Sequence, residues 1–358
     1  MAWSVWSVDT VTGVKQLRLP VASFSWVRML NQGGSGLGSI PLRSSGLSRA
    51  VLRAATTPVS RTLVIAWDDV PIYAGLVWQR KYHQATGVLT FRHGDIWSLF
   101  TDRLAIDFTA PNMEVTKQVY SGLSLATIAK RRVQLATTAA AFRNRSLPIT
   151  LPADVSGSES RTYFGYHVPI LANDLDDLTS APGGMSIDLS PRWVDNKLDI
   201  QMRAGVLNSG VYEWNLAAEK SGVIGLTLED DGAKLATNSV AIGEGSGADM
   251  LIRTHPETDV LYPAMDHVAS YKQESSEAVL FSRAVANLET FGSPTEQWGF
   301  GVLASGSPAV TDLMLGGTTK VFTADDPWIE DGGHTNRLIG FSGDLSDVVQ
   351  LQLQPGGA

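Results

Sequence analysis

The stretch Arg61–Trp67, with the sequence RTLVIAW, leads through the turn residues Asp68-Asp69-Val70-Pro71 into Ile72–Trp78, IYAGLVW. Apolar residues on both sides of a turn of this composition predict two antiparallel β-strands. A short link then leads to a third strand, Val88–Phe91. Gly75, inside the second strand, predicts a bulge or a close backbone approach. Because a meander with a bulge curls readily, the sequence predicts a small β-barrel here.

Helical and β patterns alternate in the middle of the chain. Ser124 is an expected N-cap, and the helix after it has an apolar face that Arg132 interrupts. The apolar residues of this face are Leu125, Ile128, Ala129, Leu135 and Ala136. Farther on, Met185–Ile187 and Lys197–Met202 predict a hairpin that turns at Asp195-Asn196. The middle region is therefore expected to be mixed α and β.

The last third of the chain returns to β patterns. Leu235–Ile242 and several short segments after residue 312 predict strands separated by Gly and Asp turns. A helix is predicted over 276–291, and Gly292 and Pro294 end it. Its apolar stripe consists of Leu280, Ala284, Leu288 and Phe291. We expect a second barrel-like β region that contains one helix.

Two glycine-rich segments stand out among the 34 glycines. Gly33–Gly38 is interpreted as a flexible loop. Gly243–Ala248 fits the loose G-x-G-x-x-A form of a dinucleotide-binding turn, which needs a helix directly after it to hold the pyrophosphate. The residues that follow, Asp249–Arg253, have a strand pattern, so this segment is interpreted as a hairpin loop.

Composition excludes several classes of function. The chain has 358 residues, no cysteine and a formal net charge of −8. Disulfides, cysteine nucleophiles and thiolate metal sites are thereby excluded, and an acidic chain is ill suited to grip DNA phosphates. We expect neither a membrane helix nor a secretory signal, because no apolar run is long enough and the first residues lack the signal pattern.

No motif in the sequence predicts a catalytic, cofactor-binding or metal site. The six histidines lack metal-ligand spacing and are interpreted as surface or loop residues; they are His83, His93, His167, His255, His267 and His334. Nucleophile-elbow and phosphate-loop motifs are absent. Carboxylates that could form an acid pair are interpreted as turn or helix-start residues. They are Asp174, Asp176, Asp177, Glu229 to Asp231, Asp325 and Asp326.

The N-terminal third resembles the first hub domain of phage tail-hub proteins, the family of contractile-tail baseplate hubs and siphophage tail-associated proteins. The residues that carry this resemblance are RTLVIAW-DDVP-IYAGLVW and the following VLTFRHGDIWSLFTDRLAIDF, with Arg103 at the position of a family arginine. Residues 122–129, 175–200 and 277–291 are similar to later family segments. Gly316-Gly317 departs from the Gly-Asp that the family often carries, which weakens the match there.

The resemblance implies a mainly β fold with an α+β insertion: two small tube-protein-like β-barrels and a mixed middle region. The predicted domains are 1–108, 109–215 and 216–358, and hubs of this type commonly have discontinuous domains. By resemblance, three copies form a ring in the virion that adapts a sixfold tail tube to threefold tip proteins. The implied partners are distal tail and tail tube proteins, a spike or fibre, and the tape-measure protein, with genomic DNA passing the lumen. Synthesis in the host cytoplasm is expected.

The sequence leaves two other functions open. A tail-associated enzyme that cuts cell-wall glycan would need a pair of essential acidic residues. Such enzyme domains usually follow a hub as a C-terminal extension, for which this sequence leaves little room. A carbohydrate-binding adhesin would need surface aromatic residues that stack on sugars. The candidate tryptophans are Trp3, Trp6, Trp193, Trp214, Trp298 and Trp328. Such residues more often serve as core or interface anchors.

Overall fold

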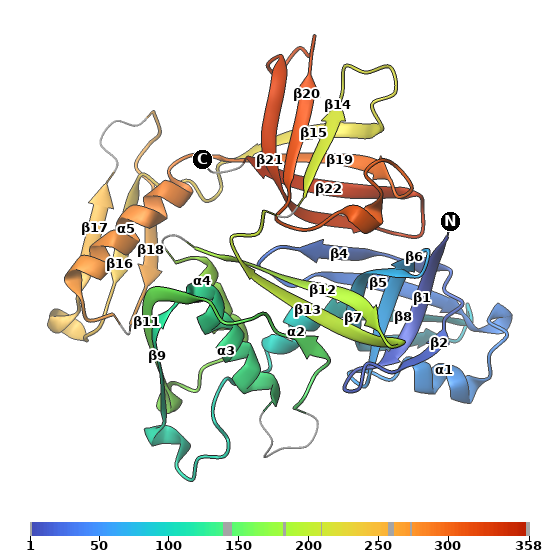
Figure 1. Ribbon diagram of the computed structural model, residues 1–358, viewed down its shortest axis with the longest axis horizontal. Helices are drawn as coiled ribbons and strands as arrows, with labels where there is room; N and C mark the ends of the chain where they lie inside the picture. Colours follow the sequence, from blue (N-terminus) through green and yellow to red (C-terminus); the bar gives the residue numbers. More distant parts are fainter. Residues whose placement is uncertain are drawn as a thin grey trace. The chain divides into compact units, whose positions relative to one another are not determined.

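The computed structural model describes residues 2–138, 145–181, 184–208, 210–256, 261–272 and 274–355 (Figure 1). The chain forms two compact units. The first comprises Met1–Thr179, Met185–Leu226 and Gly299–Ala358, and the second comprises Ser180–Gly184 and Thr227–Trp298. Within the described ranges, no helix is both long and apolar enough to cross a membrane.

The first unit contains a seven-stranded sheet built around the meander that the sequence predicts. In order, its strands are β2 (Lys15–Arg18), β1 (Trp3–Asp9), β6 (Arg61–Trp67), β7 (Val70–His83), β8 (Val88–Asp95), β5 (Ser35–Pro41) and β3 (Ser23–Phe24). Register shifts in the β6–β7 and β7–β8 pairs mark bulges in the long strand β7. Two short helices, α1 (Arg49–Ala55) and α2 (Ile96–Phe100), accompany this sheet.

A second seven-stranded sheet contains most of the C-terminal strands. Its order is β14 (Val211–Asn215), β20 (Thr318–Thr323), β21 (Gly332–Gly343), β22 (Val348–Pro355), β19 (Thr295–Leu303) and β15 (Val223–Asp231), with β4 (Trp26–Met29) pairing with β21. Strand β4 comes from the N-terminal segment, so this sheet is discontinuous in sequence. Strands β15 and β19 lead the chain into and out of the second unit.

The middle region of the first unit is mixed α and β, as predicted. The hairpin of β12 (Ser186–Val194) and β13 (Lys197–Gly205) turns at Asp195 and Asn196, which both have positive φ, and β10 (Ile149–Thr150) adds to it. A separate sheet pairs β9 (Lys117–Leu123) with β11 (Ser156–Phe164), and the helices are α3 (Leu125–Thr138) and α4 (Leu171–Thr179). The backbone N–H of Thr127 donates to Ser124 Oγ, which confirms the predicted N-cap.

The second unit contains a three-stranded sheet and one helix. The sheet order is β17 (Ile252–Pro256), β16 (Asn238–Ile242) and β18 (Asp266–Ser270), and the helix is α5 (Glu277–Phe291). Leu280 and Ala284 of the predicted stripe are fully buried against Ala241. Antiparallel pairing of β16 with β17 confirms that Gly243–Ala248 lies in a hairpin loop.

The prediction of a mainly β fold with an α+β insertion is confirmed. Two seven-stranded sheets are present where two β-barrels are expected, but among the described residues neither sheet closes on itself into a barrel. The predicted domain boundaries at 108 and 215 are not tested by the division into two units, and they stay a prediction.

The prediction of a flexible loop at Gly33–Gly38 is wrong, because these residues lead into and form β5. A Cβ added at Gly36 would lie 1.9 Å from the carbonyl oxygen of Ser25, and one at Gly38 would lie 2.2 Å from the Phe91 ring. The glycines therefore allow close packing rather than flexibility.

Candidate functional site

A buried cluster of charges joins three parts of the first unit. Arg28 on β4 donates from Nη2 to both carboxylate oxygens of Asp188 on β12, at 2.7 and 2.9 Å. Arg203 on β13 donates to the same carboxylate at 3.0 Å. Asp188 is 1% exposed and Arg28 7% exposed. Arg28 also donates to the carbonyl oxygen of Ile72 on β7, at 3.4 Å. We name Arg28, Asp188 and Arg203 the central charge cluster.

A third arginine extends this connection to the C-terminal sheet. Arg337 on β21 donates to Ser186 Oγ at 2.9 Å and to the carbonyl oxygen of Leu207 at 3.2 Å. Burial lowers the pKa of Arg337 from its ordinary value. The β12–β13 hairpin is thus bonded both to β4 and to β21 of the second sheet. These polar contacts fix the relative placement of elements that are far apart in the sequence.

Helices α3 and α4 are joined by another buried ion pair. Arg132 is fully buried and donates to Asp174 Oδ2 from Nε at 2.9 Å and from Nη2 at 2.6 Å. Its guanidinium group lies 3.9 Å from the centre of the Tyr163 ring. Burial raises the pKa of Asp174 to about 6, although Arg132 acts in the opposite direction. The interpretation of Arg132 as an interruption of the apolar face is therefore incomplete, because its charge is satisfied inside the core.

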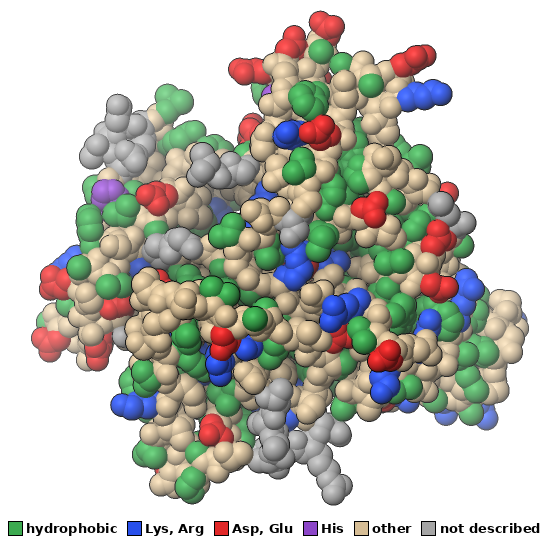
Figure 2. Space-filling model, in the orientation of Figure 1, with side chains coloured by type: hydrophobic (Ala, Val, Ile, Leu, Met, Phe, Trp, Pro, Cys, Tyr) green, Lys and Arg blue, Asp and Glu red, His purple; other side chains and the backbone are tan. Residues whose placement is uncertain are grey.

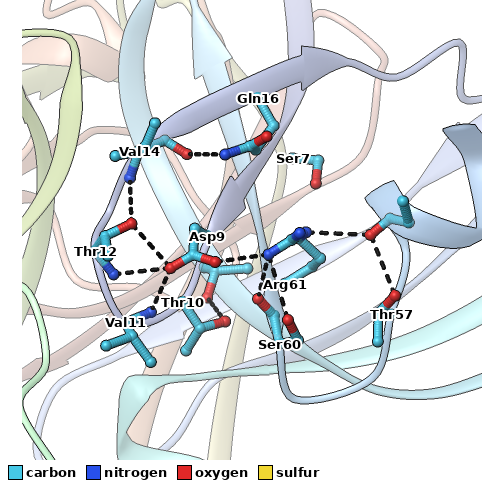
Figure 3. A network of polar contacts seen from close by, with 12 residues as sticks. Ser7, Asp9, Thr10, Val11, Thr12, Val14, Gln16, Thr57, Ser60 and Arg61 are labelled. Atoms are coloured by element: carbon cyan, nitrogen blue, oxygen red, sulfur yellow. Dashed lines mark hydrogen bonds and ion pairs between the residues drawn. The ribbon is translucent and has the colours of Figure 1, made fainter. Parts of the chain in front are cut away.

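A third network connects the first sheet to helix α1 (Figure 3). Arg61 donates from Nη1 to Asp9 Oδ2 at 2.7 Å and from Nε to the carbonyl oxygen of Ala54 at 3.1 Å. Asp9 Oδ1 accepts bonds from the backbone N–H and the hydroxyl of Thr12, both at 2.9 Å. Burial tends to raise the pKa of Asp9, but these bonds and Arg61 outweigh it and lower the pKa. The network fixes the C-terminal end of α1 against the sheet.

The structure corrects the interpretation of one histidine. His93 on β8 is only 2% exposed, stacks on Phe24 with 4.5 Å between ring centres, and lies 3.0 Å from the Tyr73 hydroxyl through Nδ1. Burial lowers the pKa of His93 to about 4, so it is a neutral core residue. The signal that could have revealed this burial is the alternation along β8, which places His93 on the same face as Leu89 and Phe91. His83 and His167 are exposed, and His255, His267 and His334 are half-buried.

The candidate acids and tryptophans are spread over the chain. Among the described residues, no group of three or more His, Cys, Asp or Glu side chains is arranged to hold a metal ion. Glu229 to Asp231 lie exposed on β15. Trp214 and Trp298 are buried, Trp3, Trp6 and Trp193 are half-buried, and Trp328 is 78% exposed. Trp6 and Trp193 enclose the ammonium group of Lys15, which lies 3.7 and 4.6 Å from their ring centres.

The middle region exposes apolar side chains beside strand edges that have no partner strand in the described part of the chain. Strands β9 and β11 form a sheet of only two strands, so each has one open edge. The exposed apolar residues of these strands and of the adjoining turns are Met113, Val115, Val119, Tyr166 and Val168, between 41% and 74% exposed. Exposed apolar residues beside a free edge are typical of protein-binding surfaces.

Comparison with known proteins gives matches by structure. No protein-family model and no curated protein sequence matches this chain. A tail protein from Neisseria meningitidis aligns with a TM-score of 0.58 at 13% identity, over 99% of this chain and 97% of that chain. A 43 kDa prophage tail protein from Shewanella oneidensis aligns with a TM-score of 0.58 at 10% identity, over 98% of both chains. The chain has the fold of phage tail proteins.

A component of the type VI secretion system of E. coli, which itself resembles tail proteins of bacteriophage T4, has a similar fold. It aligns with a TM-score of 0.50 at 10% identity, over 95% of this chain and 74% of that chain. In this fold, the buried pair of Arg28 and Asp188 joins strand β4 of the second seven-stranded sheet to the β12–β13 hairpin of the middle region. The resemblance to phage tail proteins that the sequence predicts is confirmed at the level of the fold.

Proposed function

We propose that this chain is a structural protein of the tail tip of a long-tailed phage, a baseplate hub or minor tail protein carried in the virion. The observation that supports this most strongly is the nearly end-to-end match with two tail proteins, which leaves no large part of either chain unmatched. The buried charges also favour a structural role. Asp174 and Asp188 are both paired with arginines, so neither carboxylate is available as a general acid or base.

The proposed assembly is a ring of three copies. The first unit carries two sheets of seven strands each, so three copies would present six such sheets. Six similar elements around an axis match a sixfold tail tube on one side, while the threefold axis matches a trimeric spike or fibre on the other. The central charge cluster would hold the two sheets of each copy in fixed register for this purpose. A siphophage tail tip is the proposed setting.

The net charge is consistent with a passage for DNA. A chain of net charge −8 repels phosphate groups, so a lumen lined by it would not retain genomic DNA during delivery. The tape-measure protein and the tail tube and distal tail proteins are the proposed neighbours on the tube side. The chain would be made in the host cytoplasm and assembled there into the tail.

The middle region would bind the protein at the far end of the tip. Strands β9 and β11 offer open backbone edges and exposed valines, including Val115 and Val119. A spike or fibre strand added at this edge would satisfy the free backbone groups and cover the apolar side chains. This surface is separate in sequence from the two seven-stranded sheets that we assign to the tube side.

The proposal is tested by mixing the purified protein with the tail tube protein of the same phage and imaging the product by negative-stain electron microscopy. We expect rings with threefold symmetry at one end of the tubes. The variant Val119→Glu, on the middle region, serves as the control and should still cap the tubes. Tubes that remain uncapped at every ratio of the two proteins would overturn the proposed function.

A further inference from the structure

A groove rich in arginine lies beside helix α1 in the first unit. It is lined by Arg49, Leu52 and Arg53 from α1 and by Arg80, Tyr82 and Leu89 from β7 and β8. Its volume is about 570 Å³, within the size range of binding pockets. Leu52 and Leu89 are buried, whereas Arg49, Arg53 and Tyr82 are exposed. We name it the arginine groove.

The charges of the arginine groove are unbalanced. Within the described ranges, the guanidinium groups of Arg49, Arg53 and Arg80 form no ion pair, and no acidic side chain lines the groove. Arg80 is held in place by its bond to the carbonyl oxygen of Arg53, at 2.6 Å. The groove combines buried leucine side chains with three arginines and a tyrosine. This combination fits a partner that carries both an aromatic ring and acidic side chains.

The loop between β20 and β21 has this chemistry. Its sequence is Asp325-Asp-Pro-Trp-Ile-Glu-Asp331, and Trp328 is 78% exposed at its centre. The acids of the loop form no ion pair with any described residue. Figure 2 shows acidic side chains gathered at this end of the β20–β21 hairpin. We name residues 324–331 the tryptophan loop.

The tryptophan loop has a fixed conformation although its central ring is exposed. Asp326 Oδ1 accepts the backbone N–H groups of Trp328 and Ile329, at 2.8 and 2.9 Å. The backbone N–H of Asp325 donates to Asp331 Oδ1 at 2.8 Å, and Thr323 donates to the carbonyl oxygen of Glu330 at 2.6 Å. A loop that is already ordered loses little entropy when it binds, which favours a role in recognition.

We propose that the tryptophan loop of one copy of this chain binds in the arginine groove of the next copy. Both features lie in the first unit, and Figure 1 shows the ends of β20 and β21 well apart from α1, so one copy would use them on different sides. A contact between two different surfaces of identical chains is head-to-tail, and it closes into a ring when the rotation allows. This inference rests on the proposed ring and names the contact that holds it together.

The side chains of the tryptophan loop and of the arginine groove would stabilise the contact in two ways. The Trp328 ring would cover Leu52 and Leu89 and stack with Tyr82 or a guanidinium group, as tryptophan anchors do at the centre of interfaces. The acids around it would pair with Arg49, Arg53 and Arg80. Because neither set of charges has an ion-pair partner within the chain's described residues, binding would satisfy both without breaking an existing pair.

The test measures self-association of the full-length protein by light scattering over a range of concentrations. Trp328→Ala should weaken it about tenfold or more, as expected for a central anchor. Arg49→Glu should weaken it as well, although an acid at the start of α1 suits the helix dipole and should not unfold the helix. Arg18→Glu and Leu261→Ala, exposed residues outside both features, are the matched controls and should associate like the wild type.

Mixing the variants makes the test specific to a head-to-tail contact. Trp328→Ala keeps an intact groove and Arg49→Glu keeps an intact loop, so an equimolar mixture should form a one-to-one dimer and no ring. Wild-type association by Trp328→Ala, or no dimer in the mixture, overturns the inference. If the wild-type chain stays monomeric but caps tail tubes, only the inference is overturned. If it stays monomeric and does not cap the tubes, the proposed function is overturned as well.

Discussion

Arg28 and Asp188 form a buried ion pair of 2.7 Å although 160 residues separate them in the sequence. Arg28 lies on β4, an N-terminal strand that pairs with β21 of the C-terminal sheet. Asp188 lies on β12 of the middle region and is shared with Arg203. The pair therefore connects the N-terminal, middle and C-terminal parts of the first unit.

Removing the shared carboxylate should destabilise the protein strongly. Asp188→Ala leaves the buried Arg28 and the partly buried Arg203 without a counter-charge, and loss of one partner of a buried pair costs about 3–5 kcal/mol. The free energy of unfolding, measured by urea denaturation, should fall by about this amount. Asp154→Asn, which removes an exposed partner of Lys130 and Arg131, is the control and should change it much less. Equal effects of the two variants would contradict the assigned role of the cluster.

The burial of His93 predicts a dependence of stability on pH. Its pKa is about 4 in the folded chain and about 6.5 when unfolded, so the unfolded state binds the proton first as the pH falls. This contribution to stability is complete above pH 6.5 and is lost progressively down to about pH 4, by up to about 3 kcal/mol. The difference between wild type and His93→Gln, measured by urea denaturation at each pH, isolates the effect. If the free energies of unfolding of wild type and His93→Gln, plotted against pH, stay parallel between pH 7 and 4, His93 is not responsible for the pH dependence.

The packing of β5 predicts different effects on stability for alanine substitutions at Gly36 and Gly33. A Cβ at Gly36 would overlap the Ser25 carbonyl oxygen at 1.9 Å, whereas a Cβ at Gly33 would meet its nearest atom at an ordinary 3.4 Å. Gly36→Ala should lower the free energy of unfolding by about 1–3 kcal/mol, in the range of overpacked sites. Gly33→Ala should leave it nearly unchanged. A flexible loop at this position, as the sequence suggested, would tolerate both substitutions equally.

The exposed valines of the middle region predict a loss of binding without a loss of stability. Val119 is 59% exposed on β9, so Val119→Glu removes no core packing and should leave the melting temperature unchanged. Under the proposed function, the variant should incorporate less spike or fibre protein into tails. Immunoblots of purified tails can measure this, with Val59→Glu, at an exposed valine (45%) outside the middle region, as control. Normal incorporation would remove the middle region from the proposed contact.

Local patterns in the sequence were sufficient for the individual elements. The strands around Asp68 to Pro71, the hairpin at Asp195-Asn196 and the cap at Ser124 follow from turn chemistry and side-chain period, and the structure has each of them. These features depend on residues close together in the chain, where propensity and hydrogen bonding determine the outcome.

Features that depend on distant residues could not be predicted. Arg132 looks like a polar interruption until Asp174 and Tyr163 are placed beside it. Gly36 and Gly38 look flexible until Ser25 and Phe91 are known to lie against them. Likewise, no local pattern contains the tertiary pairing that places β4 in the second sheet and forms the separate unit around α5.

The proposed trimeric hub is tested most directly by the mass of the purified full-length protein, measured by light scattering on a size-exclusion column at increasing concentrations. A hub that adapts a sixfold tube to a threefold tip should approach the mass of three chains, each of 38.4 kDa. We expect a trimer, or a steady rise toward one with concentration. A monomer at every concentration, with no binding to the tail tube protein, would contradict it.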